Sequence, residues 1–328
     1  MKMKSIFITG GAGYVGAVLV PFLLSKGLKI TVFDLMIYGE DVLSPHKNLK
    51  KIKGDIRDQK LLKENIPGHD CVIHLACISN DPSFELNPKL GKSINLDAFE
   101  PLVSISKNSK VKRFIYASSS SVYGIKYEKK VTEDISLEPL TDYSKYKVEC
   151  EKILNKYISD DFTPVTIRPA TVCGYSPRQR LDVVVNILTN LAYNKRKITI
   201  FGGKQLRPNI HIFDMVKAYE TLLEAPKEKI SGEVFNAGYE NQSVLELANL
   251  VKTIVGDDVT LSSQTSDDNR SYHISSKKIK RVLNFEATKT IANAIQDLKV
   301  AFDQGLLPNS LTDEKYFNIK RMNNINLR

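Results

Sequence analysis

The chain has 328 residues, of which 42% are hydrophobic and 26% charged, and its formal net charge is +10. This length can bury a large core and predicts two unequal lobes, whereas no apolar run reaches the roughly 18 residues that a membrane-spanning helix needs. The four cysteines (Cys71, Cys77, Cys150 and Cys173) lack the spacing of a disulfide framework and no signal peptide precedes the first strand, so we expect a cytoplasmic protein.

The positive charge raises the question of a nucleic-acid or membrane partner. The basic residues are scattered, however, and no interleaved aromatic residues accompany them. A lysine-rich, solvated surface explains the charge without either partner, so we expect no nucleic acid and no membrane to be bound.

The first forty residues carry the clearest pattern. Residues 5–9 read as a buried strand, a glycine-rich turn leads into an apolar helix of about residues 14–26, and a second strand ends on Asp34. Gly10, Gly13 and Gly16 let the backbone pass close to a pyrophosphate, toward which the helix start directs N–H groups. Asp34 lies where a carboxylate accepts hydrogen bonds from an adenosine ribose and repels a 2′-phosphate. The pattern predicts a dinucleotide site that takes NAD rather than NADP.

Three further strands, at residues 51–53, 70–77 and 111–117, end in residues suited to binding. In a doubly wound sheet the carboxyl ends of the strands face the cofactor. Asp55 and Ile56 follow the first strand and are placed to hold the adenine. The polar loop 78–83 follows the second, beside the expected nicotinamide, and leads to a helix that carries Asn95. Four serines, at 118–121, follow the third.

Residues 69–77 also contain two histidines and two cysteines, which superficially look like metal ligands. Strand alternation places Cys71 and Cys77 on one face and His74 on the other. A shared ion would need them on one side, so we expect no metal.

Tyr143 and Lys147 lie four residues apart at the start of an expected helix, and therefore on one helix face. The spacing alone says little, because it recurs twice. Only the first pair opens a helix shortly after a hydroxyl-bearing strand end in the dinucleotide lobe. The other two pairs are Tyr193 with Lys197 and Tyr316 with Lys320.

The regular alternation of strands and helices ends with a strand at residues 165–169. We therefore expect an α/β protein: a doubly wound parallel-sheet Rossmann domain with a smaller C-terminal α/β substrate-binding lobe. The Rossmann domain would comprise residues 1–172 and about 208–237, and the substrate lobe about 173–207 and 238–328. We expect the polar, basic tail from residue 303 to be only partly ordered.

With these motifs the chain resembles the extended short-chain dehydrogenases/reductases of the NAD-dependent nucleotide-sugar epimerase/dehydratase family, over about residues 5–300. The resemblance rests on Thr9-Gly10-Gly11-Ala12-Gly13-Tyr14-Val15-Gly16, Gly54-Asp55, His74-Leu75-Ala76, the serine run 118–121 with Val122-Tyr123-Gly124, Tyr143-x-x-x-Lys147, Arg168-Pro169, Arg207 with Ile210-His211-Ile212-x-Asp214, Phe235-Asn236-Ala237-Gly238 and residues 267–272 around Arg270.

The resemblance implies that Tyr143 is the catalytic acid/base, Lys147 its electrostatic partner and ribose anchor, and Ser119 a hydrogen-bonding hydroxyl. A lysine ammonium and an oxidised nicotinamide would lower the pKa of tyrosine from about 10. The expected cofactor contacts are Gly10, Gly13, Tyr14, Val15, Gly16, Asp34, Asp55, Ile56, Leu75, Ala76, Asn95 and Lys147. The expected substrate contacts are Ser79, Asn80, Ser120, Arg178, Asn186, Arg207 and Arg270, of which Arg207 and Arg270 match positions that grip a diphosphate.

Departures from the family pattern bear on the reaction. In the 4,6-dehydratases an Asp and a Glu follow the catalytic hydroxyl, where this chain has Ser120 and Ser121, so dehydration is disfavoured. The loop 79–82 and the run 176–182 resemble a branch that includes GDP-heptose 4-dehydrogenase-like proteins, which leaves both nucleotide and sugar open.

We therefore expect an NAD-dependent epimerase that acts at C4 of a nucleotide-diphosphate sugar through a 4-keto intermediate. A 4-dehydrogenase or 4-ketoreductase that makes one hydride transfer would use the same residues. A non-catalytic nucleotide- or RNA-binding relative is the remote alternative.

Two expected helices, about residues 95–107 and 143–157, should lie side by side on one sheet face. In the resembling family the corresponding helices pair across a dimer. Their apolar residues exceed what sheet packing alone needs, which predicts a two-fold homodimer. These residues are Ile94, Leu102, Val103, Ile105, Val148, Ile153 and Leu154.

Overall fold

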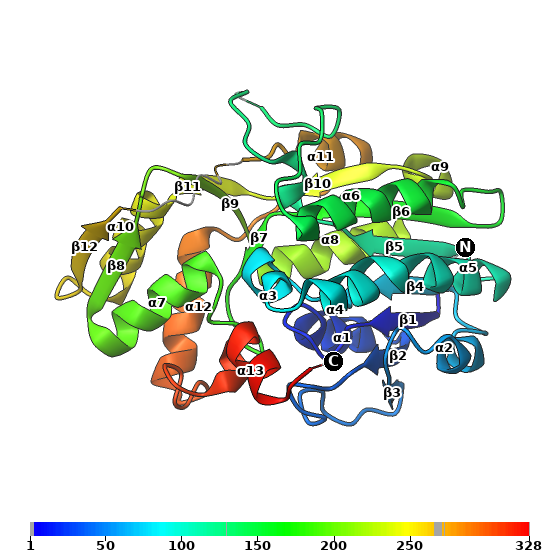
Figure 1. The fold of residues 1–328 in the computed structure, drawn as a ribbon, viewed down its shortest axis with the longest axis horizontal. Coiled ribbons are helices and arrows are strands. Elements are labelled where there is room, and N and C mark those ends of the chain that lie inside the picture. Colours follow the sequence, from blue (N-terminus) through cyan, green and yellow to red (C-terminus); the bar gives the residue numbers. More distant parts are fainter. Residues whose placement is uncertain (1–2, 129, 266–270, 272, 328) are drawn as a thin grey trace.

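A seven-stranded parallel sheet forms the centre of the larger lobe in this computed structural model, which describes residues 3–128, 130–265, 271 and 273–327 (Figure 1). The strand order is β10-β6-β5-β4-β1-β2-β3, and each neighbouring pair is parallel. The strands are β1 (Ser5–Thr9), β2 (Lys29–Asp34), β3 (Leu49–Lys53), β4 (Cys71–His74), β5 (Arg113–Ala117), β6 (Thr163–Pro169) and β10 (Val234–Ala237). The order reverses between β1 and β4, which places a ligand crevice at the carboxyl ends of these two strands.

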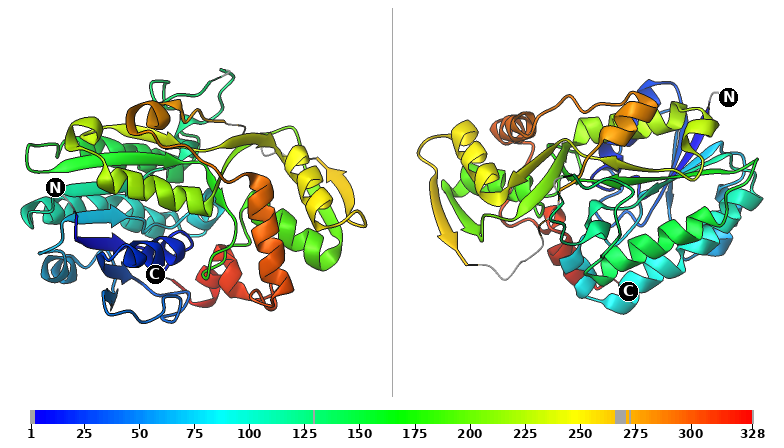
Figure 2. Two further views of the ribbon diagram at one scale, coloured as in Figure 1. Left: turned by 180° about the vertical axis from the view of Figure 1, so that it is seen from behind. Right: turned by 90° about the horizontal axis from the view of Figure 1, so that it is seen from above.

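Helices cover both faces of this sheet (Figure 2). Alternate strand residues enter two cores: Ile6 and Ile8 belong to one cluster, whereas Phe7 belongs to the other. The first cluster includes residues of α1 (Gly16–Ser25), α8 (Ile212–Glu224), α9 (Lys227–Ile230) and α11 (Lys277–Leu283). The second includes residues of α2 (Gln59–Asn65), α3 (Asp81–Glu85), α4 (Pro88–Lys92), the π-helix η1 (Ser93–Asp97), α5 (Phe99–Asn108) and α6 (Asp142–Asn155). The expected doubly wound Rossmann domain is confirmed.

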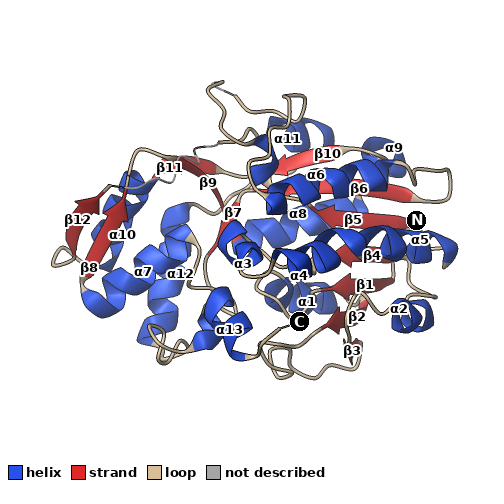
Figure 3. Ribbon diagram, in the orientation of Figure 1, coloured by secondary structure: helices blue, strands red, loops and turns tan. Residues whose placement is uncertain are grey.

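Within the described residues, the smaller lobe has two short sheets and three longer helices, and Figure 3 shows their arrangement. A three-stranded sheet has the order β11-β9-β7, and β12 pairs with β8. Val185, Leu247 and Ile295, one from each long helix, are fully buried in one core. The elements are β7 (Thr171–Cys173), α7 (Val184–Lys195), β8 (Lys197–Phe201), β9 (Leu206–His211), β11 (Glu240–Ser243), α10 (Val244–Val255), β12 (Thr260–Gln264) and α12 (Ile291–Asp303).

Two C-terminal segments return to the larger lobe, although residues 238–328 were all expected in the smaller one. Ile279 of α11 is fully buried in the same core as α1. Beyond η3 (Glu314–Tyr316), helix α13 (Asn318–Asn324) places Met322 in the core that α5 shares with α6. The tail therefore packs first on the smaller lobe, where Leu307 and Tyr316 are buried with Leu298 of α12, and then on the larger lobe through α13. The expectation that it is only partly ordered is wrong for residues 303–327. Apolar positions such as Met322, sparse in a polar tail, are what anchor it.

The helix surface expected to form a dimer is largely used within the single chain. α5 and α6 do lie side by side. Six of the seven apolar residues on which the dimer prediction rested are buried in the chain itself, because they face the sheet or the neighbouring helix, and only Ile153 stays partly exposed. The homodimer stays a prediction, but these residues do not supply the reason for it.

Helices within the described ranges are either too short or too polar to cross a membrane.

Candidate active site

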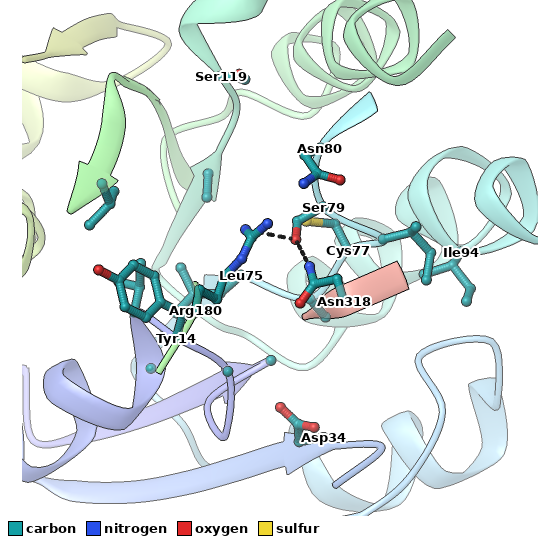
Figure 4. A pocket seen from close by; sticks show the side chains of 18 of the residues that line it. Tyr14, Asp34, Leu75, Cys77, Ser79, Asn80, Ile94, Ser119, Arg180 and Asn318 are labelled. Carbon is teal, nitrogen blue, oxygen red and sulfur yellow. Dashed lines mark hydrogen bonds between the residues drawn. The ribbon is translucent and has the colours of Figure 1, made fainter. Parts of the chain in front are cut away.

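A cavity opens at the carboxyl ends of β1, β2, β4 and β5, where the strand order reverses (Figure 4). Loops after these strands form most of its wall, and the smaller lobe and the C-terminal segment close it. Most of the expected cofactor contacts line it: Gly10, Gly13, Tyr14, Val15, Gly16, Asp34, Asp55, Ile56, Leu75 and Ala76. So do Ser119 and Tyr143, and four of the expected substrate contacts, Ser79, Asn80, Ser120 and Arg178.

The glycine turn is shaped by close backbone approaches. A Cβ on Gly10, which has φ of 73°, would lie 2.5 Å from the Ala76 nitrogen, and a Cβ on Gly16 would lie 2.3 Å from the Gly11 oxygen. A Cβ on Gly13 would meet only the Gly10 oxygen, at 3.1 Å, so this glycine keeps the cavity side of the turn open. The amides of Ala17, Val18 and Leu19 donate to the Gly13 and Val15 carbonyls, so the helix extends back into the glycine turn and directs the positive end of its dipole toward the cavity. The turn therefore fits the diphosphate of a dinucleotide.

Asp34 ends β2 with its carboxylate already oriented. Oδ2 accepts a hydrogen bond from the Ala12 amide at 3.0 Å, and Oδ1 accepts one from the Met36 amide at 2.8 Å. Burial raises the pKa of Asp34 above its ordinary value, although these two amides and the Arg178 guanidinium act in the opposite direction. Each oxygen keeps a second lone pair for a ligand hydroxyl, as binding of a ribose requires.

Tyr143 and Lys147 lie on the first turns of α6, which begins with a capping box between Thr141 and Ser144. The Lys147 ammonium lies 5.7 Å from the centre of the Tyr143 ring. It donates a hydrogen bond of 2.7 Å to the Ala117 carbonyl at the end of β5. The same strand end carries Ser119, whose hydroxyl lies 2.9 Å from that of Ser121. Helix α6 and strand β5 thus place a phenol, an ammonium and a pair of hydroxyls together.

Burial raises the pKa of Tyr143 well above its usual value, although the residue lines the cavity. The Cys77 thiol and the Asp81 carboxylate add to this rise, whereas the Arg180 guanidinium and the Ser119 hydroxyl oppose it. The sequence led us to expect a lowered pKa. In the protein alone, desolvation of a phenolate outweighs the nearby positive charge of Arg180 and the hydrogen bond of Ser119.

Arg180, Ser79 and Asn318 form a hydrogen-bonded chain between Asp34 and Ser119 in the view of Figure 4. Ser79 Oγ accepts hydrogen bonds from Arg180 Nη1 at 3.2 Å and from Asn318 Nδ2 at 3.0 Å, so its own proton is free to bind a ligand. Asp182 fixes the guanidinium of Arg180 through Nε at 2.8 Å. Sequence reasoning missed Arg180 and Asn318. The acidic residue two positions after Arg180 was the available signal for the first, and nothing local marks the second.

Two expected ligand contacts have positioning roles instead. The amide of buried Asn95 is used by the Ile78 backbone, with one hydrogen bond of 2.8 Å and one of 2.9 Å, so it holds the loop after β4. Asn186 accepts a hydrogen bond from the Gly174 amide and donates to Tyr14 Oη and the Arg180 carbonyl. Because their polar atoms are satisfied by the protein, both residues support the cavity wall from behind.

The remaining expected contacts lie elsewhere. Lys147 does not line the cavity itself but is buried behind Tyr143, with its ammonium 5.1 Å from the centre of the Tyr116 ring. Arg207 is on β9 in the smaller lobe, where its guanidinium donates to the Leu206 carbonyl. Arg270 lies outside the described residues. Within the described ranges, no three His, Cys, Asp or Glu side chains are grouped so as to hold a metal ion.

A buried ion pair behind the catalytic groups was also missed. Arg168 on β6 binds Glu151 on α6 through two hydrogen bonds, Nε to Oε1 at 3.0 Å and Nη2 to Oε2 at 2.7 Å. Glu151 Oε1 also accepts a hydrogen bond from Ser118 at 2.5 Å. Arg168 donates to Tyr123, which donates to Asn236. The network ties α6 to the strand ends that carry Ser119.

The model of the NAD dependent epimerase/dehydratase family matches residues 6–238, more than half of the chain. The chain belongs to this family. An uncharacterized UDP-glucose epimerase of Bacillus subtilis, YtcB, is 30% identical over 312 residues, which cover 88% of this chain and 95% of that protein. A dTDP-D-glucose 4,6-dehydratase of Dictyostelium discoideum is 33% identical over 273 residues, or 76% of this chain and 60% of that protein. A UDP-glucose 4-epimerase of Thermotoga maritima, crystallised with UDP-glucose, has the same fold, with a TM-score of 0.84, 24% identity, and coverage of 92% and 99%.

Family membership makes the chain an NAD-dependent enzyme, and the cavity fits that cofactor. The glycine turn would hold the diphosphate of NAD, and Asp34 the adenosine ribose. Tyr143, Ser119 and Leu75 line the cavity at its other end, toward β4 and β5. When bound there, NAD supplies hydride-transfer chemistry.

Proposed function

We propose that this enzyme epimerises a nucleotide-diphosphate sugar at C4. The observation that carries the proposal is the convergence of Ser119, Tyr143 and Lys147 beside a dinucleotide site. Tyr143 takes the proton of the C4 hydroxyl as the C4 hydrogen leaves as hydride, which turns the C–OH group into a ketone. Lys147 and Ser119 stabilise the phenolate through charge and hydrogen bonding. Return of hydride to the opposite face of the ketone, with the proton from Tyr143, gives the epimer.

The two serines that follow Ser119 support epimerisation over dehydration. Elimination of water needs an acid or base beside the sugar in addition to the tyrosine. Of the described carboxylates that line the cavity, Asp34 is held by two backbone amides, and Asp55 pairs with Arg57 at 2.6 Å. Asp81 accepts the hydroxyl of Thr141 at 2.5 Å, at the start of α6. Ser120 and Ser121, which follow Ser119, bring hydroxyls rather than carboxylates.

The test is incubation of the protein with UDP-, GDP-, dTDP- and CDP-hexoses, followed by nuclear magnetic resonance and mass spectrometry of the products. Epimerisation leaves mass and total NAD unchanged. Accumulation of NADH in proportion to product would instead show a 4-dehydrogenase, and loss of one water a dehydratase.

Tyr143→Phe should abolish turnover and leave NAD binding nearly intact, because only the proton-carrying hydroxyl is lost while the ring still packs. Tyr193 and Tyr316, which share the same spacing to a lysine, provide matched controls. Both pack with α12 of the smaller lobe, and neither lines the cavity. Tyr193→Phe and Tyr316→Phe should keep activity, and equal activity of Tyr143→Phe and the unmodified enzyme would remove Tyr143 from the mechanism.

A further inference from the structure

The C-terminal segment closes one side of the NAD cavity. Asn318, Met322 and Leu327 line the cavity together with the glycine turn. The segment is fixed at the start and in the middle of α13: the Asn318 backbone amide donates to Asp182 Oδ2 at 2.9 Å, and Arg321 Nε donates to the Ile37 carbonyl at 2.5 Å. In Figure 1, α13 lies between the smaller lobe and the loops of the larger lobe, beside the C-terminus.

The side chain of Asn318 joins three segments that are distant in sequence. Its Oδ1 accepts hydrogen bonds from Tyr38 Oη at 2.8 Å and from Arg178 Nη2 at 2.6 Å, and its Nδ2 donates to Ser79. Tyr38 follows β2, Ser79 follows β4, and Arg178 follows β7. A single buried amide therefore holds the loops that follow β2, β4 and β7 in one arrangement around the cavity.

Arg178 has hydrogen-bonding capacity that the described protein residues leave unused. It is only 4% exposed and its guanidinium lies 3.5 Å above the centre of the Tyr38 ring. Nη2 is engaged by Asn318, but Nε and Nη1 have no hydrogen-bond partner within the described residues. Burying a cation whose N–H groups have no acceptor destabilises the protein unless an anion binds to those groups. The guanidinium lines the cavity and stacks on Tyr38, four residues after Asp34, which places it at the adenosine end.

From these observations we infer that Arg178, oriented by Asn318, binds the diphosphate of NAD from the side opposite the glycine turn, and that the C-terminal segment thereby slows release of the cofactor. A diphosphate presents two negative charges and several acceptor oxygens, which suit the free edge of a guanidinium. The sequence had suggested that Arg178 contacts the substrate. A nucleotide sugar also carries a diphosphate, but the contact with Tyr38, in the loop that follows Asp34, assigns Arg178 to the cofactor. The inference rests on NAD binding and holds whichever sugar is the substrate.

The experiment measures release of NADH from the full-length protein. Protein loaded with NADH is mixed with excess NAD, and the decay of NADH fluorescence gives the dissociation rate. Arg178→Met keeps a side chain that can pack on Tyr38, and Asn318→Ala removes the orienting amide. Each should raise the rate at least about tenfold, as expected for loss of a charge-assisted contact. The controls are Arg281→Met on α11 and Asn323→Ala on α13, both exposed positions that should release NADH at the unmodified rate.

Asn318→Asp separates binding from folding. A carboxylate of the same shape would neutralise Arg178 within the protein, so the unliganded variant should melt at the same or a higher temperature yet release NADH faster. Isothermal titration with adenosine, ADP-ribose and UDP identifies the group that is bound. Arg178→Met should weaken the binding of ADP-ribose and leave the binding of adenosine and UDP unchanged. The inference would be overturned if correctly folded Arg178→Met and Asn318→Asp released NADH at the unmodified rate. It would also be overturned if Arg178→Met weakened binding of adenosine as much as binding of ADP-ribose, or weakened binding of UDP instead of ADP-ribose.

Discussion

The ion pair between Glu151 and Arg168 offers a test of how the fold holds its catalytic groups. Both side chains are almost fully buried, with 6% and 5% of their surface exposed. Glu151 lies one helical turn after Lys147, and its carboxylate also binds Ser118, the neighbour of Ser119. We predict that Glu151→Leu damages stability and catalysis together, because it leaves Arg168 buried without its carboxylate and frees both catalytic elements.

The magnitude follows from the burial of the pair. Removing one partner of a buried ion pair costs about 3–5 kcal/mol, whereas replacing both with apolar residues of similar size is often neutral. For a chain of this size, such a loss should lower the melting temperature by roughly 4–7 °C. The double variant Glu151→Leu/Arg168→Met should recover most of this stability, since no buried charge remains. It should not recover activity, and kcat should stay at least about tenfold below that of the unmodified enzyme, because α6 is no longer fixed to the strand end carrying Ser119.

Calorimetry or urea unfolding, together with turnover of the nucleotide sugar, measures both effects. Glu149 is the matched control: it pairs with Lys152 on the exposed face of the same helix, with 49% of its side chain exposed. Glu149→Leu should change stability by less than about 1 kcal/mol. A double variant as unstable as Glu151→Leu would show that stranded charge is not the cause. Recovery of full activity by the double variant would show that the pair does not position the site.

Three further predictions concern other parts of the chain. Burial lowers the pKa of His74 to about 3, below the 6.5 of an unfolded histidine. Between these values only the unfolded chain takes up the proton, so the free energy of unfolding should fall as the pH decreases from 6.5 toward 3. Urea unfolding should show that His74→Gln loses less stability than the unmodified protein over this pH range. Cys77 is the partly exposed cysteine at the cavity, whereas the other three are buried and burial raises the pKa of Cys150 to about 12. A thiol reagent should therefore label Cys77 first, and bound NAD should slow this labelling. Peptide mass spectrometry that finds Cys150 labelled first would contradict the prediction. The homodimer should appear in light scattering as a species of about twice the 36.9 kDa chain mass. Ile153→Asp, at a partly exposed position of α6, should dissociate it. A monomer of the unmodified protein at micromolar concentration would refute the prediction.

The parts of the site that the sequence predicted are those in which one short segment fixes the geometry. The glycine turn, the strand before it and Asp34 lie within thirty residues, and the tight approaches at Gly10 and Gly16 explain why the pattern needs glycine. Tyr143 and Lys147 were identified because a helix places residues four apart on one face. Strand-end positions were also predictable, since parallel strands bring their carboxyl ends to one edge of the sheet.

The parts that the sequence did not predict depend on contacts between distant segments. Asn318 binds Arg178, 140 residues away, Ser79, 239 residues away, and Tyr38, 280 residues away. A single asparagine in a polar tail carries no periodicity or motif that announces such contacts. The same limit explains the reversed roles of Asn95 and Asn186, whose polarity suggested ligands although their amides satisfy backbone groups of the protein. It also explains the dimer surface, because apolar composition does not tell which side of a helix faces the sheet.

The rate of cofactor release bears directly on the reaction. An epimerase returns the hydride to the same sugar, so one bound NAD serves any number of turnovers and never needs to leave. A 4-dehydrogenase must exchange NADH for NAD in each cycle, so its cofactor dissociation rate has to equal or exceed kcat. The contacts of Asn318 and Arg178 would suit the first regime, because they close the cavity around the cofactor with buried hydrogen bonds. If the dissociation rate of NADH is lower than kcat for the sugar, repeated dehydrogenation at that kcat is impossible for this chain. If the dissociation rate is higher, closure by the C-terminal segment does not distinguish the two reactions, and the analysis of products decides between them.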